Sequence, residues 1–78
     1  MFDLIDTLTI QQILDLGFEC TREGHSFSLI DDEKAVLKIA FVDKTVWFVT
    51  EDALYSTMAS DMIIKMVKLG YIVENKKL

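Results

Sequence analysis

The 78-residue chain contains no proline and only three glycines, so few positions interrupt regular secondary structure. Linkers and disordered tails are rich in these residues and poor in apolar ones, whereas 51% of this chain is hydrophobic. A single cysteine excludes an internal disulfide and is typical of a reducing, intracellular compartment. We therefore expect one compact domain over residues 1–78, with residues 1–8 as a possible arm and residues 75–78 as a frayed tail.

The sequence also lacks the features of a secreted or membrane protein. No basic segment followed by an apolar stretch opens the chain, and no apolar run approaches the roughly 18 residues of a membrane span. The net charge of −5 disfavours nonspecific binding to nucleic acid, because the phosphates would be repelled. We expect a cytoplasmic protein that binds neither membranes nor nucleic acid.

The most informative stretch is AVLKIAFVDKTVWFVT at residues 35–50, which predicts two strands folded back through Asp43 and Lys44. Pairing Val42 with Thr45 sets the register of this hairpin. The resulting pairs are Phe41 with Val46, Ile39 with Phe48, and Leu37 with Thr50. The inner face then consists of Leu37, Ile39, Phe41, Val46 and Phe48.

Two earlier strands are predicted on either side of Gly24, which supplies the positive φ of their turn. Pairing Arg22 with His25 places four further apolar residues on the inner face. These residues are Phe18, Cys20, Phe27 and Leu29. The next loop, near residues 31–34, must hold an odd number of residues, because an even loop would split the core. With an odd loop, the predicted pairs are Phe27 with Ile39 and Leu29 with Leu37.

Capping signals predict two helices. Thr9 and Gln12 form a capping box that starts a helix over residues 10–16, with Gly17 as its left-handed cap. A long helix should begin near Thr50 and end at residue 69, with a possible break at residues 56–57. Its apolar stripe consists of Leu54, Tyr55, Met58, Ala59, Met62, Ile63, Met66 and Leu69. The predicted fold is α+β: a short N-terminal helix, a four-stranded antiparallel meander and a long C-terminal helix on one sheet face, in the order α-β-β-β-β-α.

No constellation of residues predicts catalysis, a cofactor site or a metal site. Cys20 alternates onto the core face, where a thiol behaves as a small inert hydrophobe. His25 has no nucleophile beside it, and one histidine with one cysteine is not a four-ligand zinc set. The acidic run at residues 31–33 lacks the alternating ligands and central glycine of a calcium loop, and no phosphate-binding glycine loop exists. We expect a protein that is not an enzyme.

The outer face of the hairpin around Trp47 is more apolar than a solvated sheet face should be. Its candidate interface residues are Val36, Ala40, Val42, Trp47 and Val49. Either a partner covers this face, or the N-terminal arm or the tail through Ile72 folds across it. We favour an interface, since apolar patches in proteins of this size usually mark a partner. The last strand of the meander would also be an open edge, where a second copy pairs.

Acidic residues gather at one end of the predicted sheet. They are Asp31, Asp32, Glu33, Glu51 and Asp52. Surface solubilisation explains them most simply, and mimicry of nucleic acid is a third functional hypothesis. The leading hypothesis is a small acidic protein-interaction module, a homodimer by self-association, comparable in size and composition to phage or mobile-element inhibitors of host proteins. The alternative is a winged-helix-like DNA-binding protein that presents Lys65 and Lys68 to the groove.

Overall fold

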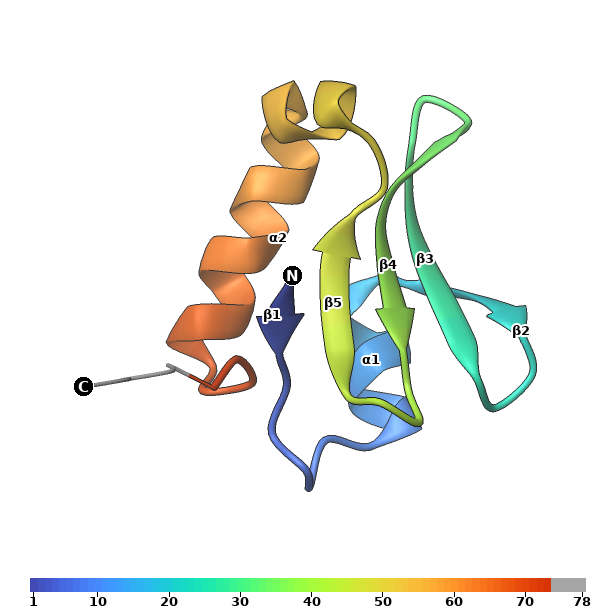
Figure 1. Cartoon of the computed structure of the whole chain (residues 1–78), viewed down its shortest axis with the longest axis vertical. Helices are drawn as coiled ribbons and strands as arrows, with labels where there is room; N and C mark the ends of the chain where they lie inside the picture. Colours follow the sequence, from blue (N-terminus) through green and yellow to red (C-terminus); the bar gives the residue numbers. More distant parts are fainter. Residues whose placement is uncertain (74–78) are drawn as a thin grey trace.

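The computed structural model describes residues 1–73, which form a five-stranded antiparallel sheet, two α-helices and a 3-10 helix (Figure 1). The strands are β1 (Phe2–Asp3), β2 (Glu19–Arg22), β3 (Ser26–Asp31), β4 (Lys34–Ala40) and β5 (Thr45–Phe48). The helices are α1 (Ile10–Leu16), η1 (Glu51–Tyr55) and α2 (Thr57–Lys68). The predicted α+β class and antiparallel sheet are confirmed, whereas the predicted frayed tail at residues 75–78 lies outside the described residues. No helix of the described part is long and apolar enough to span a membrane.

The N-terminal arm adds a fifth strand that the sequence patterns do not predict. The strand order is β1-β5-β4-β3-β2, so β5 lies between β1 and β4. The Leu4 N–H donates to the Lys44 carbonyl at 2.8 Å, and Leu4 also forms a bridge with Ile72. Phe2 anchors the arm, since its ring packs edge-on against Phe48 with centroids 6.5 Å apart. The prediction that β5 is an open edge is therefore wrong, because the arm occupies that edge.

The β3–β4 hairpin combines a correct register with a wrong loop length. Phe27 pairs with Ile39 and Leu29 with Leu37, as predicted. The loop, however, holds only Asp32 and Glu33, both at positive φ, 53° and 67°. A bulge follows the Leu29–Leu37 pair, because Ile30 pairs with Ala35 and leaves Val36 as the extra residue. The extra residue that we assigned to the loop is therefore in the bulge. The bulge keeps the inner-face residues of β3 and β4 on the same side of the sheet.

The β4–β5 hairpin is shifted by two residues from the predicted register. Its pairs are Leu37 with Phe48, Lys38 with Trp47, Ile39 with Val46, and Ala40 with Thr45. Four residues therefore form the turn, and the Lys44 N–H donates to the Phe41 carbonyl at 3.2 Å within it. Lys44 also places its amino group 3.7 Å from the centre of the Phe41 ring. A shift of two residues leaves every side chain on its predicted face.

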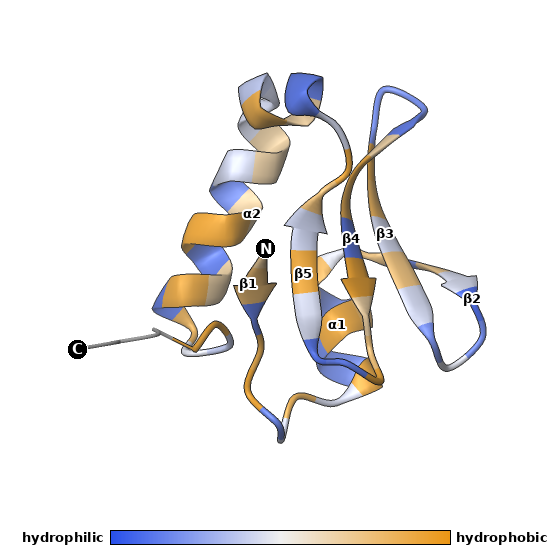
Figure 2. Ribbon diagram, viewed as in Figure 1, coloured by the Kyte–Doolittle hydropathy of each residue, from blue (hydrophilic) through white to orange (hydrophobic). Residues whose placement is uncertain are grey.

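A single hydrophobic core lies between the inner face and the helices. Its buried members are Leu4, Leu8, Ile13, Phe18, Phe27, Leu29, Val36, Leu37, Ile39, Val46, Ala53, Ala59, Met62 and Met66. Apolar residues recur along β4, β5 and α2, which bring many of these side chains together (Figure 2). Cys20 pairs with Phe27 but is exposed, so its predicted core position is wrong. The reason is that β2 is an edge strand whose four residues are all exposed.

The capping signals of both helices are confirmed. Thr9 and Gln12 form the complete capping box, and Gly17 ends α1 at φ 111°. The long helix is interrupted as predicted, because Thr50 caps η1 and Ser56 caps α2. Only part of the predicted apolar stripe is buried, and its exposed members are Leu54, Tyr55, Met58 and Leu69. Leu54 and Tyr55 lie in η1, whose three residues per turn change its phase relative to α2. Met58 lies in the first turn of α2, and Leu69 is its C-cap.

Candidate functional site

The outer face of the sheet consists of side chains in rows that cross the strands. One row contains Glu19, Ser28, Lys38 and Trp47. The next row contains Arg22, Ser26, Ala40, Thr45 and Asp3. Figure 1 shows α1 behind the sheet and α2 beside β1, so neither helix crosses the face turned toward the viewer. Trp47, opposite Lys38 in the first row, has intermediate exposure.

The structure brings together three of the five candidate interface residues. Ala40 and Trp47 lie on neighbouring strands of the outer face, and Val49 follows two residues beyond Trp47. Val42 lies in the β4–β5 turn and is 72% exposed. Val36 is the extra residue of the bulge and is buried at 8% exposure, although it lines the cavity described next. The prediction that Val36 is an exposed interface residue is therefore wrong.

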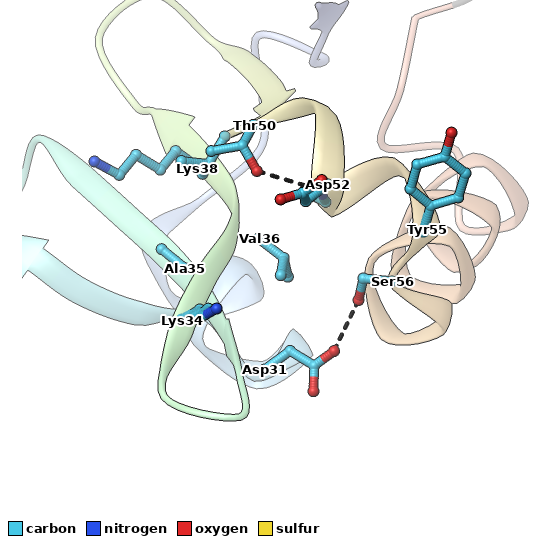
Figure 3. A pocket seen from close by; sticks show the side chains of 11 residues that line it. Asp31, Lys34, Ala35, Val36, Lys38, Thr50, Asp52, Tyr55 and Ser56 are labelled. Carbon is cyan, nitrogen blue, oxygen red and sulfur yellow. Dashed lines mark hydrogen bonds between the residues drawn. The ribbon is translucent and has the colours of Figure 1, made fainter.

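A cavity of about 590 Å³ adjoins the outer face, between the β3–β4 hairpin and η1 (Figure 3). Its apolar lining consists of Ala35, Val36, Val49 and Ala53. Its polar lining consists of Asp31, Lys34, Lys38, Thr50, Asp52, Tyr55 and Ser56. The volume lies within the range of about 300–1,000 Å³ that is usual for ligand sites. A hollow that combines four apolar side chains with four charged ones suits an amphipathic side chain or molecule.

Two hydrogen bonds position the walls of this cavity. The Ser56 hydroxyl donates to the Asp31 carboxylate at 2.8 Å, which joins the β3–β4 hairpin to the start of α2 (Figure 3). The Thr50 hydroxyl accepts from the Ala53 N–H at 3.3 Å and so starts η1. The sequence analysis did not predict this cavity. Only the capping residues Thr50 and Ser56, which line it, could be recognised from the sequence.

The predicted acidic residues are distributed over two parts of this region. Asp31 and Asp52 both line the cavity, where Lys34 and Lys38 accompany them. Asp32 and Glu33 form the exposed β3–β4 turn. Glu51 lines a smaller hollow of about 380 Å³ together with Trp47, and residues 49 and 50 line both hollows. Acidic and basic side chains therefore share the cavity.

The lysines of the winged-helix hypothesis lie apart from these hollows. Lys65 and Lys68 are exposed in the last turn of α2. Within residues 1–73, no three His, Cys, Asp or Glu side chains come together in a group suited to a metal ion. No protein-family model, no curated protein sequence and no solved structure matches the chain.

Proposed function

We propose that the protein is a non-enzymatic interaction module that self-associates as a homodimer through the outer face of its sheet. One observation carries this proposal: the chain's only tryptophan is partly exposed on a sheet face that no described helix crosses. Tryptophan is enriched among the residues that dominate interface energies, and a partner can contact the part of the Trp47 side chain that remains exposed. Trp47 lies on β5, between the central strand β4 and the two-residue edge strand β1.

The charges of the outer face favour a second copy as the partner. Two acids, Asp3 and Glu19, and two bases, Arg22 and Lys38, occupy the rows around Trp47. This face is therefore neutral, although the whole chain carries a net charge of −5. Two copies of an acidic protein repel each other least through a neutral face. In a two-fold dimer the same face is used by both copies, so the acids of one copy lie opposite a face that contains Arg22 and Lys38.

Sedimentation measurements at two concentrations test this function directly. We expect the parent mass to rise with concentration toward twice 9.0 kDa. Trp47→Lys should stay monomeric with the parent's circular dichroism, because a lysine is expensive to bury at an interface but harmless on a solvated strand. Leu14→Lys is the matched control, since Leu14 is an exposed apolar residue of α1, on the other side of the sheet.

Two results would contradict the proposal. A parent that stays monomeric at the highest concentration would leave the outer face to a different partner, such as a host protein. A Trp47→Lys chain that fails to fold would show that the indole belongs to the core of the monomer.

A further inference from the structure

We infer that each protomer of the proposed dimer inserts its Trp47 side chain into the 590 Å³ cavity of the other protomer. The inference rests on the proposed self-association and identifies the group that fills the cavity. The occupant is therefore a second copy of this chain, through one residue. Three properties of the described residues support it: the position of the cavity, its chemistry and its size.

The cavity and Trp47 lie next to each other on one surface. Lys38 lines the cavity and is the residue directly opposite Trp47 in the β4–β5 register. Val49 lines the cavity as well, two residues beyond Trp47. In a two-fold dimer, any contact of a first site with a second site occurs twice. A two-fold axis between Trp47 and the cavity would therefore place the indole of each protomer in the cavity of the other.

The chemistry of the lining suits an indole. The apolar side chains of Ala35, Val36 and Val49 can cover the ring. A lysine amino group over an aromatic face adds a cation–π interaction, and tryptophan is the best partner for it. Figure 3 shows the Lys34 amino group and the Asp52 carboxylate on the cavity side, whereas the Lys38 amino group points away. The Asp52 carboxylate supplies the acceptor that a buried indole N–H requires.

The cavity is large enough to admit an indole, since cavities of about 300–1,000 Å³ accept whole drug-sized molecules. An indole is the largest side chain that the outer face offers, so it fills more of the cavity than any other single side chain of that face. Interfaces are packed as densely as protein interiors at their centre, which favours the indole over a valine or an alanine.

Mixing two variants tests the exchange of indoles. Trp47→Ala removes the inserted group, and Ala35→Phe fills the cavity from β4. Each variant alone has lost both contacts, and we expect its self-association to weaken about 1,000-fold, at about 30-fold for each hot-spot contact. An equimolar mixture restores one contact, between Trp47 of the Ala35→Phe chain and the open cavity of the other chain. The mixed dimer should therefore be only about 30-fold weaker than the parent.

Two controls accompany the mixture. Leu14→Phe adds an aromatic ring on the exposed side of α1, which lies behind the sheet, and should leave self-association unchanged. Lys34→Glu is the second cavity variant, for use if Ala35→Phe does not fold. Lys34 is exposed, and its replacement should weaken self-association about tenfold by removing a cation–π partner from both contacts. Unchanged association in Lys34→Glu would overturn the inference.

The remaining outcomes separate this inference from the proposed function. A dimeric parent with an equally dimeric Ala35→Phe would show that the cavity stays empty, which overturns the inference and leaves self-association standing. A mixture that associates no more tightly than either variant alone would also overturn the inference, because Trp47 of one chain would then not bind in the open cavity of the other. A monomeric parent would overturn both. If N-acetyltryptophanamide then shifted the Val36 methyl resonances saturably, the cavity would belong to a separate aromatic ligand.

Discussion

The Ser56 hydroxyl donates a hydrogen bond of 2.8 Å to the Asp31 carboxylate across 25 residues of sequence. The same oxygen accepts from the Ala59 N–H at 3.1 Å, so it caps α2 as well. One small side chain thus fixes the start of the helix relative to the β3–β4 hairpin. Because both residues line the cavity, this link also determines the position of its walls.

Ser56→Ala should lower the free energy of unfolding by about 2 kcal/mol, because it removes a helix cap and a hydrogen bond to a charged group together. Urea denaturation with an unchanged slope would measure this loss. Asp31→Asn keeps the cap and should cost less, about 1 kcal/mol, since the amide oxygen still accepts a hydrogen bond. Ser60→Ala, in the interior of α2, is the control and should change little. Equal losses in Ser56→Ala and Ser60→Ala would show that the link contributes nothing.

Phe27 and Phe48 should differ in their contributions to stability, although both lie on the predicted inner face. Phe27 is 1% exposed, and Phe27→Ala should cost about 3–5 kcal/mol, as truncations of buried phenylalanines do. Phe48 is only partly buried near the β1 edge, so Phe48→Ala should cost less, about 2 kcal/mol. Thermal and urea melting of both variants would compare them. If both variants melted like the parent, the core described above would be wrong.

The faces of the sheet could be predicted because side-chain alternation depends only on whether a register shift is odd or even. The β4–β5 pairing moved by two residues, and the bulge at Val36 compensated for the even loop before it. Neither change exchanges the inner and outer faces. Ala40, Trp47 and Val49 therefore stayed on the predicted outer face, whereas Val36 is buried.

The turn and the cavity could not be predicted, for local reasons. A two-residue turn at positive φ normally contains glycine or asparagine, and Glu33 gives no such signal. The cavity depends on the bulge in β4 and on the phase of a five-residue 3-10 helix, and apolar periodicity reports neither feature. Strand β1 has only two residues, which is too short for an alternation to be recognised.

Glu33→Gly should stabilise the protein by about 0.5–1 kcal/mol. Glu33 has φ 67°, a conformation that is unfavourable for a side chain with a Cβ and free of strain for glycine. The variant also creates the Asp-Gly sequence that two-residue hairpin turns prefer. Lys34→Gly is the matched control; Lys34 lies in β4, where glycine weakens a strand, so this change should destabilise. A lower melting temperature for Glu33→Gly would show that the Glu33 side chain has a role of its own.

Ser28→Ala should leave stability unchanged or raise it by up to about 1 kcal/mol. Ser28 is 1% exposed, and its hydroxyl has no hydrogen-bond partner within the part of the chain that is described. A buried polar group without a partner costs free energy, and the methyl group of alanine has no such cost. Ser26→Ala, the next outward residue of β3, provides the comparison on the same face. A loss above about 1 kcal/mol in Ser28→Ala alone would reveal a partner for the hydroxyl, such as an ordered water.

Duplex DNA should not bind measurably at physiological salt. The chain carries a net charge of −5, and Lys65 and Lys68 are the only bases on α2. Two lysines release few counterions, so they provide little of the electrostatic affinity on which nonspecific binding depends. Fluorescence anisotropy with a labelled duplex, at about 50 and about 150 mM salt, would measure any binding. Salt-sensitive binding that is lost in the double variant Lys65→Gln/Lys68→Gln, but retained in Lys34→Gln/Lys38→Gln, would favour the winged-helix hypothesis over the interaction module.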